Sequence, residues 1–476
     1  MKVPVPTLRA RPRSCTRLRA VDLRPPALHF GAATIGLLAL LVRLPWMFDR
    51  VDPEQPPDTL EYLAMASAVQ HGTLFPDGSL PRTPGYAYLV ALCDLLPGPA
   101  AANTAAVQHL LGVVLAVAVC LLGARWFGRA VGLISGGLLA ISPQMFAIED
   151  AVLPDFMLGT LVFAACALTV WAAAPRRRTR SWPWVAVGAA TAAAVLVKPV
   201  AGVLIALVPL ALLPASAGWR RTALATAIAA ATALVALSPW LIRNAIVHDR
   251  PSLAGQLGMT LYNRVFEIDG RPIVPRGSAQ SRVAAVYGVR AVQALGLRPH
   301  AAVHGVLMER FGYDGWQASA AMRKLAVDEI RRYPFTFARR TFELASGPVR
   351  SAPGAEQAAL PLRPRAGDAG TGVARASWWV SQRVGKAWWI VTLHGWAIVA
   401  GLLLCDEARR LRLLVISAGA ALVALAVAAT HGGVDRYWWS LHPGVVLAAT
   451  AGAAAIVAAV ARGRRRRRPA PPSASA

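Results

Sequence analysis

The chain has 476 residues and a formal net charge of +26, yet 56% of its residues are hydrophobic and only 16% are charged. A typical soluble domain has about 25% charged residues, so this composition indicates an integral membrane protein and excludes a disordered chain, a collagen and a disulfide scaffold. The basic excess would also suit nucleic-acid binding, unless the arginines cluster beside apolar segments, where they act as orientation signals.

Apolar segments recur along the chain. The first, residues 28–48, follows seven Lys and Arg residues and ends in Trp46, Met47 and Phe48. Because no small-residue cleavage site follows it, we expect an uncleaved helix rather than a signal peptide. Together with nine later segments it predicts an all-α polytopic membrane protein with about ten transmembrane helices, most near the required length of roughly 20 residues. The later segments are 104–123, 129–147, 152–174, 183–197, 199–214, 222–242, 386–404, 411–430 and 441–461.

Basic residues predict the direction of these spans. With ten spans, the segments on one side carry 24 Lys and Arg residues, whereas the short loops 49–83 and 431–440 on the other side carry three. Cytoplasmic loops hold such an excess, so we expect both termini in the cytoplasm. Merging 183–197 with 199–214 into one long helix would reverse every later loop. The same clustering accounts for the net charge without nucleic acid.

Two further segments are not expected to cross the membrane. Residues 84–98 are apolar but short and contain Asp94, which predicts a juxtamembrane helix in the outer interface. In the long segment that follows the seventh span, the apolar spacing of Met322, Ala326 and Ile330 predicts a helix over 315–333 that ends before Pro334.

The predicted organisation therefore has five parts. They are a basic cytoplasmic N-terminus 1–27, an N-terminal transmembrane module 28–242 with a first outer loop 49–103, a mainly helical extracytoplasmic segment 243–385, C-terminal transmembrane helices 386–461 and a basic cytoplasmic tail 462–476.

Ionisable residues interrupt several spans, although each costs about 2.5–3.5 kcal/mol at the bilayer centre on insertion scales. Snorkelling to the interface would account for any single basic residue, but a short carboxylate such as Asp155 cannot snorkel far. Six acidic residues also lie in the loop 49–83. Cations and carboxylates gathered at one face predict an outward-facing site for an anionic substrate. The interrupting residues are Arg43, Asp155, Lys198, Arg243 and Arg436.

A series of motifs follows the first span. The first outer loop carries PDTLEYLAMASAVQHGTLF (57–75) and then RTPGYAYLVAL (82–92). The later motifs are ISPQMFAIEDAVLPDFMLGTL (141–161), LVKPVAG (196–202), SPWLIRNAIVH (238–248), AAMRKLAVDEIRRYPFTF (320–337) and VDRYWWSLHP (434–443). In type and order they resemble the motifs of GT-C glycosyltransferases, in particular the dolichyl-phosphate-mannose–protein mannosyltransferase group and its bacterial relatives, including the aminoarabinose transferases.

The resemblance implies a fold, a reaction and a site. Donors of the family are sugars on a polyprenyl phosphate at the outer leaflet. Asp58 would take the proton of the acceptor hydroxyl, with Glu61 as the alternative base. Asp155 would assist the acceptor, and a divalent cation on Asp58 and Asp155 is an open alternative. The leaving phosphate would meet Lys198, Arg243 and Arg436, and the remaining motif residues expected to bind substrate are Tyr62, Arg82, Tyr86 and Tyr437.

Other interpretations of these residues stay open. Asp58 also suits a solvated loop acid, and Asp155 suits a carboxylate that faces a helix dipole after Pro154. For the whole chain the alternative is a lipid-linked saccharide transporter or flippase, which would favour midplane charges and inverted repeats; the sequence shows neither. We expect a polyprenyl-phosphate sugar donor, a glycan, lipid or protein acceptor, and no nucleic acid. The richness in Ala, Arg and Val indicates a GC-rich genome, and we expect a bacterial plasma membrane with an envelope polymer or glycolipid as acceptor.

Overall fold

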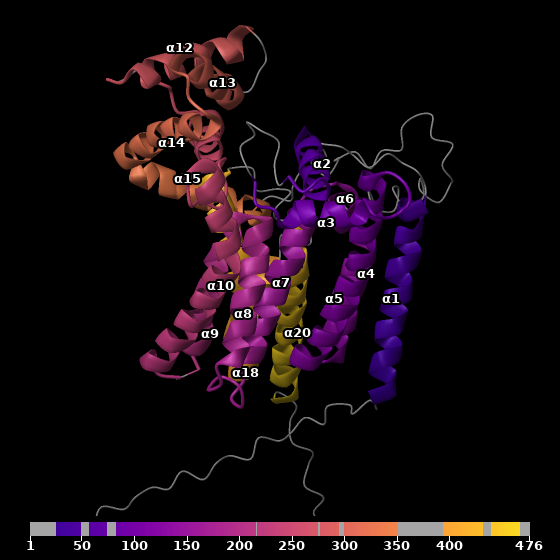
Figure 1. Ribbon diagram of the computed structural model, residues 1–476. Helices are drawn as coiled ribbons and strands as arrows, with labels where there is room; N and C mark the ends of the chain where they lie inside the picture. The colour runs from indigo at the N-terminus through magenta and orange to yellow at the C-terminus, as the bar shows by residue number, and fades with distance from the viewer. Residues whose placement is uncertain are drawn as a thin grey trace, which may run out of the picture.

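The structure is a computed structural model that describes residues 25–48, 57–73, 82–215, 217–274, 277–294, 299–350, 394–431 and 439–466. Every regular element in these ranges is a helix, as the sequence predicts. Long helices form a bundle, and a smaller group of helices, α12 to α15, lies beyond one end of it (Figure 1). The protein is thus an all-α polytopic membrane protein.

One part of the bundle consists of α1 (Pro25–Phe48), α4 (Ala100–Phe127), α5 (Arg129–Ala140), α17 (His394–Leu404) and α20 (His442–Arg466). Small residues let these helices approach closely, as is usual between membrane helices. A Cβ at Gly132 on α5 would lie 2.3 Å from the carbonyl oxygen of Cys120 on α4. Likewise, a Cβ at Gly452 on α20 would lie 1.8 Å from the carbonyl oxygen of Ala397 on α17.

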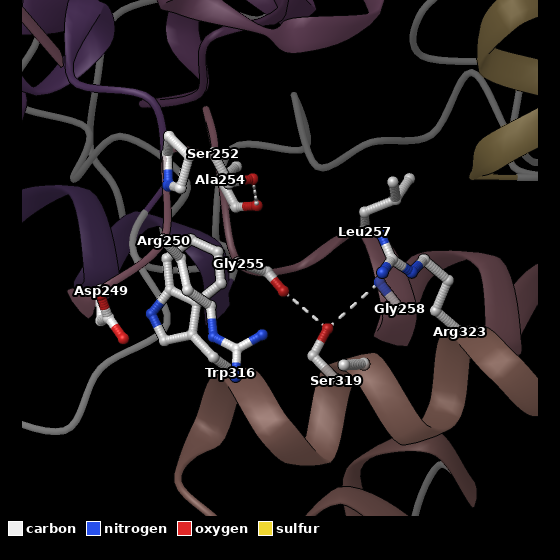
Figure 2. A pocket seen from close by; sticks show the side chains of 12 residues that line it. Asp249, Arg250, Ser252, Ala254, Gly255, Leu257, Gly258, Trp316, Ser319 and Arg323 are labelled. Atoms are coloured by element: carbon white, nitrogen blue, oxygen red, sulfur yellow. Dashed lines mark hydrogen bonds between the residues drawn. The ribbon is translucent and has the colours of Figure 1, made fainter. Parts of the chain in front are cut away.

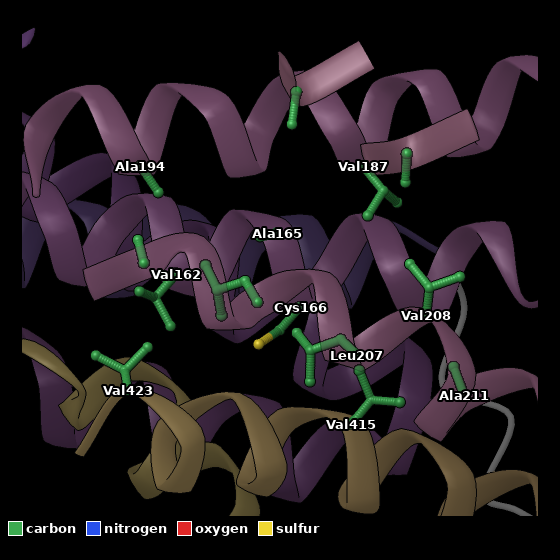
Figure 3. Packing of buried hydrophobic residues seen from close by; sticks show 14 of the residues in the cluster. Val162, Ala165, Cys166, Val187, Ala194, Leu207, Val208, Ala211, Val415 and Val423 are labelled. Carbon is green, nitrogen blue, oxygen red and sulfur yellow. The ribbon is translucent and has the colours of Figure 1, made fainter. Parts of the chain in front are cut away.

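The other part contains α7 (Asp155–Ala172), α8 (Trp182–Val197), the 3-10 helix η1 (Pro199–Ala206), α9 (Leu207–Leu212), α10 (Trp219–His248) and α18 (Glu407–Thr430). Its apolar core brings together side chains that are far apart in the sequence. Val162 and Cys166 of α7 meet Leu207 of α9 and Val415 and Val423 of α18 (Figure 3).

The predicted break between two short spans lies where the sequence places it. α8 ends at Lys198, whose backbone is extended, and Pro199 begins η1, which packs against α8. A 3-10 helix rises about 2.0 Å per residue, more than the roughly 1.5 Å of an α-helix. Eight residues of η1 and six of α9 therefore extend about 25 Å, close to the hydrocarbon core of about 30 Å.

The length and apolar composition of the helices account for only part of the predicted number of membrane spans. Within the described residues, six helices are long and apolar enough to cross a membrane, or seven if α5 and α6 (Pro143–Asp150) form one bent span. Three apolar helices are shorter: α8, η1 with α9, and α17. The predicted total of about ten includes these and stays a prediction. The segment predicted as a span over 129–147 is bent, because α5 ends at Ala140, Ser142 caps α6, and the two helices meet at 51°.

Short helices cover one end of the bundle, where Figure 1 shows α2 (Pro57–Gln70), α3 (Gly85–Cys93) and α6. We call it the α2 end. The helix predicted within 84–98 is α3. α1 begins and α20 ends at the opposite end, so both lie on one side, as charge parity predicts. Which side faces the cytoplasm stays a prediction.

The outer group of helices follows α10. It comprises α11 (Leu257–Tyr262), the π-helix η2 (Asn263–Ile268), α12 (Ala279–Ala294), α13 (Pro299–Phe311), α14 (Gly315–Arg332) and α15 (Pro334–Arg350). α14 matches the predicted helix 315–333. It starts with a reciprocal capping box, in which Asp314 and Gln317 satisfy free backbone N–H groups of the first turn. It stops before Pro334, because proline has no backbone N–H to continue the helical hydrogen bonds.

Candidate functional site

Three residues of α2 face one arginine. Asp58, Glu61 and Tyr62 are three or four positions apart and share a face of the helix. The guanidinium of Arg82 donates from Nε to Glu61 Oε2 (2.6 Å) and from Nη2 to Asp58 Oδ1 (3.2 Å). The same group lies 5.1 Å from the centre of the Tyr62 ring. The Asp58 side chain is 37% exposed and that of Glu61 53%, so both carboxylates are accessible to an acceptor.

The turn that carries Arg82 is fixed to the end of α8. The hydroxyl of Thr83 donates to the carbonyl of Val197 (3.0 Å). A Cβ at Gly85 would lie 2.8 Å from the carbonyl oxygen of Leu196, so only glycine permits this approach. The R-T-P-G-Y segment thereby brings the turn with Arg82 to the end of α8, where Lys198 follows Val197.

Asp155 and Lys198 form a buried ion pair. Lys198 Nζ donates to Asp155 Oδ1 at 2.8 Å, and Asp155 is 2% exposed at the first turn of α7. The preceding turn is held against α2, because the hydroxyl of Thr59 donates to the carbonyl of Val152 (3.1 Å). The sequence suggested different partners for the two groups, an acceptor for Asp155 and a phosphate for Lys198; in the structure they neutralise one another.

Tyr62 is buried and faces the guanidinium of Arg82. Burial raises the pKa of its phenol, Arg82 and Lys198 act in the opposite direction, and Asp155 raises it further. The hydroxyl is therefore neutral at physiological pH. The hydrogen bonds from Thr59 to Val152 and from Thr83 to Val197 bring α2 and Arg82 to the same end of the bundle as the pair of Asp155 and Lys198. The ring of Tyr86 meets that of Tyr62 edge-on at 5.1 Å.

A buried amide links α3 to the turn before Asp155. Tyr86 donates its phenolic hydrogen to Gln108 Oε1 (3.2 Å). The Gln108 amide nitrogen donates to the carbonyls of Glu149 (2.8 Å) and Ala151 (3.0 Å). Gln108 thus fixes the end of α6 relative to α3, and no motif in the sequence indicates this role.

A second network of charged residues connects α1, α4 and α6, and the sequence did not predict it. Arg43 binds Glu149 with two hydrogen bonds, Nε to Oε2 (2.8 Å) and Nη2 to Oε1 (2.9 Å). His109 Nδ1 is 2.9 Å from the same carboxylate, and its Nε2 is 3.8 Å from Asp150. All four side chains are buried. Gly112 makes room for the carboxylate, since a Cβ there would lie 2.2 Å from Glu149 Oε1.

This network could have been found from the sequence only in outline. Arg43 stood out as a cation in an apolar span, and Glu149-Asp150 stands in the motif that ends at Asp155. Nothing in the spacing pairs residues 43 and 149, which are 106 positions apart. In the structure the pair needs no snorkelling, because the bidentate bond satisfies the guanidinium internally.

The remaining predicted residues are Arg243, Arg436 and Tyr437. Arg243 is on α10, where it donates to Asn244 Oδ1 (2.9 Å), lies 3.0 Å from His248 Nε2 and packs over Trp240. Arg436 and Tyr437 are outside the described residues, so their proposed roles stay predictions.

A divalent cation does not fit the arrangement as it stands. Among the described residues, no group of three His, Cys, Asp or Glu side chains is placed to hold a metal ion. Asp58 and Asp155 are each paired with a cation of the chain, Arg82 and Lys198. A metal ion would have to displace these partners.

Comparison with known proteins supports the resemblance drawn from the motifs. The family described as dolichyl-phosphate-mannose-protein mannosyltransferase matches residues 81–242. This range includes Arg82, Asp155 and Lys198 but not Asp58. No curated protein sequence matches the chain.

The solved structures to which the chain is similar include those of two proteins. One is the archaeal oligosaccharyltransferase AglB from Archaeoglobus fulgidus, in complex with an inhibitory peptide and a dolichol-phosphate (13% identity, TM-score 0.48, 93% of this chain covered). This chain spans 52% of that protein's length. The other is ArnT from Cupriavidus metallidurans, bound to undecaprenyl phosphate (16% identity, TM-score 0.36) or in the apo state (16%, 0.37), with 93% of this chain and 81% of that chain covered in each.

The family match lies on a multi-pass helical fold, so over this segment the chain is similar to membrane glycosyltransferases of the GT-C type. Within that class, residues 81–242 are similar to the mannosyltransferase family named above. The predicted resemblance is confirmed to this extent.

Proposed function

We propose that the protein moves a sugar from a polyprenyl-phosphate donor to a hydroxyl of a glycan, lipid or protein acceptor at the outer face of the membrane. The observation that carries the proposal is that the ion pairs Asp58–Arg82 and Asp155–Lys198 lie at the same end of the bundle, where the hydrogen bond from Thr83 to Val197 links their segments. A carboxylate exposed to the acceptor and cations beside it are the groups that such a transfer requires.

Asp58 is the base in this mechanism. Its carboxylate accepts the proton of the acceptor hydroxyl as the oxygen forms a bond to the anomeric carbon of the donor sugar. The bond between that carbon and the phosphate oxygen breaks, and its electron pair stays on the phosphate. Arg82 holds Asp58 through one hydrogen bond (3.2 Å), and this bond orients the carboxylate.

Arg82 and Lys198 offset the charge of the leaving phosphate. Each shares its charge with a carboxylate in the absence of donor, so donor binding would replace part of that pairing by bonds to phosphate oxygens. The neutral Tyr62 hydroxyl lies near both cations and is a donor for the same phosphate or for the sugar. A phosphate monoester is a weak base, so the mechanism needs no protonating acid.

The direct test is transfer in a reconstituted system. Purified full-length protein is incorporated into liposomes with a pool of radiolabelled polyprenyl-phosphate sugars, and bacterial membrane fractions supply acceptors. We expect label to move into the acceptor fraction only when protein is present. A flippase would expose the donor at the other leaflet without any transfer of label, and that result would replace the proposal by the rival function.

A further inference from the structure

A pocket opens in the outer group of helices, away from the two ion pairs. Its volume is about 360 Å³, at the lower end of the range of about 300–1,000 Å³ for small-molecule sites. The walls are the segment 249–258, between α10 and α11, and the first turns of α14 (Figure 2). α14 lies beyond the end of the bundle in Figure 1, so a ligand here would come from water rather than from the hydrocarbon.

Hydrogen bonds and close packing hold the two walls together. The hydroxyl of Ser319 on α14 donates to the carbonyl of Gly255 (2.6 Å) and accepts from the backbone N–H of Gly258 (3.1 Å). A Cβ at Gly258 would lie 1.7 Å from the carbonyl oxygen of Ser319. On the other side, the amide of Asn244 donates to the carbonyl of Ser252 (2.6 Å). The pocket is therefore built into the backbone of both walls.

The lining combines two cations with an aromatic ring. Arg250 and Arg323 are exposed at the pocket, and among the described residues neither forms an ion pair with a carboxylate. Trp316 contributes an indole whose nitrogen is buried and has no hydrogen-bond partner within the described part of the chain. Asp249 is the one acidic residue of the lining. Guanidinium groups recognise phosphate and carboxylate in two-point contacts, and an indole offers a flat apolar surface with one N–H donor.

The pocket is connected to the candidate site by one residue. Gln256, within the same wall segment, lies with its amide nitrogen 3.5 Å from Glu61 Oε2. Glu61 in turn accepts from Arg82, which also holds Asp58. A ligand in the pocket thus lies beside the α2 carboxylates, with the side chain of Gln256 reaching from the pocket wall to Glu61.

We propose that this pocket binds the acceptor, and that the acceptor is an anionic saccharide carrying a phosphate or a carboxylate. Arg250 and Arg323 would bind the anion, and Trp316 would pack against the sugar ring. The binding claim stands on the pocket itself, whereas the assignment to the acceptor rests on the proposed transferase function.

Binding is measured by saturation-transfer difference NMR on purified full-length protein in detergent. The probes are mannose 6-phosphate, mannose and inorganic phosphate. We expect mannose 6-phosphate to bind at least about tenfold more tightly than either fragment, since two partial contacts combine in one ligand. Equal affinity for mannose 6-phosphate and inorganic phosphate, or no saturable binding of the sugar phosphate, would overturn the proposal.

Variants separate the two contacts. The double variant Arg250→Gln/Arg323→Gln should weaken mannose 6-phosphate binding by about tenfold or more, whereas Lys324→Gln, the neighbouring cation on α14 outside the lining, should leave it unchanged. Trp316→Ala should reduce mannose 6-phosphate affinity to that of inorganic phosphate, and Trp316→Phe should restore part of it. A loss with Lys324→Gln as large as with the double variant would show a general charge effect and contradict the site.

The transfer assay then tests the assignment to the acceptor. The double arginine variant should lower label incorporation into acceptor membranes while the Michaelis constant for the donor stays unchanged. Normal transfer by a variant that has lost sugar-phosphate binding would contradict the acceptor role. If the wild-type protein binds mannose 6-phosphate but transfers nothing, the proposed function fails and the binding site stands.

Discussion

The ammonium of Lys198 lies 2.8 Å from the carboxylate of Asp155, and both groups are buried at the α2 end of the bundle. Neither is therefore a lone charge in the membrane. The pair joins the break between α8 and η1 to the first turn of α7, two segments that are 43 positions apart. To bind a donor phosphate, Lys198 would have to weaken or break its ion pair with Asp155.

Lys198→Ala should destabilise the protein as well as impair donor binding. Removing one partner of a buried pair leaves an uncompensated charge and costs about 3–5 kcal/mol. The double variant Asp155→Asn/Lys198→Met should recover most of that stability. Thermal unfolding in detergent, followed by tryptophan fluorescence, measures both effects. Equal midpoints for wild type and Lys198→Ala would mean that the pair is not formed in the protein.

Gly112→Ala should disturb the network of Arg43, Glu149 and His109. The added methyl would lie 2.2 Å from Glu149 Oε1, so the carboxylate would have to leave Arg43. We expect the free energy of unfolding to fall by roughly 1–3 kcal/mol, as is usual for overpacking. We also expect lower transfer, because Glu149 lies in the last turn of α6, just before the segment that leads to Asp155.

The matched control for Gly112→Ala is Gly305→Ala on α13, where a Cβ meets nothing within 4 Å. A glycine in a helix interior lowers stability by about 0.5–1 kcal/mol relative to alanine, so this control should be neutral or stabilising. A destabilisation as large in Gly305→Ala as in Gly112→Ala would remove the argument from the network.

The loop 49–83 should face the outside of the cell. In a cysteine-free background, a cysteine at Ser79 should react with a membrane-impermeant thiol reagent in intact cells. A cysteine at Ser181, which is exposed at the start of α8 at the opposite end of the bundle, should react only after lysis. The reverse pattern would invert the topology and place the candidate site in the cytoplasm.

The sequence predicted the helices better than it predicted the contacts between them. Apolar length identified α1, α4, α7, α10, α18 and α20, and Pro199 correctly marked the turn after α8. The bend between α5 and α6 was missed, because residues 129–147 form one apolar run and the capping role of Ser142 is local. Hydropathy averages over a window and does not register a single capped turn.

Contacts between charged groups were less predictable than their positions. Asp58 and Arg82 were each selected from motifs, and their bond was not, because it depends on how the turn at Gly85 packs on α8. Glu61 was expected to be the alternative base near the same face as Asp58. The structure agrees with that geometry, since both accept hydrogen bonds from Arg82. The pocket beside Trp316 had no sequence signal, because its walls come from two segments separated by about 60 residues.

The most direct measurement of the central claim is the turnover of Asp58→Asn in the reconstituted transfer assay. Asparagine keeps the size of the side chain but cannot take a proton, and the loss of a general base typically costs about 10²–10⁴-fold in rate. We expect transfer to fall by at least this factor at normal expression and with donor binding nearly intact, and Glu61→Gln to retain most of its turnover. Retention of more than about a tenth of wild-type turnover in Asp58→Asn would contradict the account, since a solvated surface carboxylate changes stability by no more than about 0.5 kcal/mol and leaves the chemistry intact.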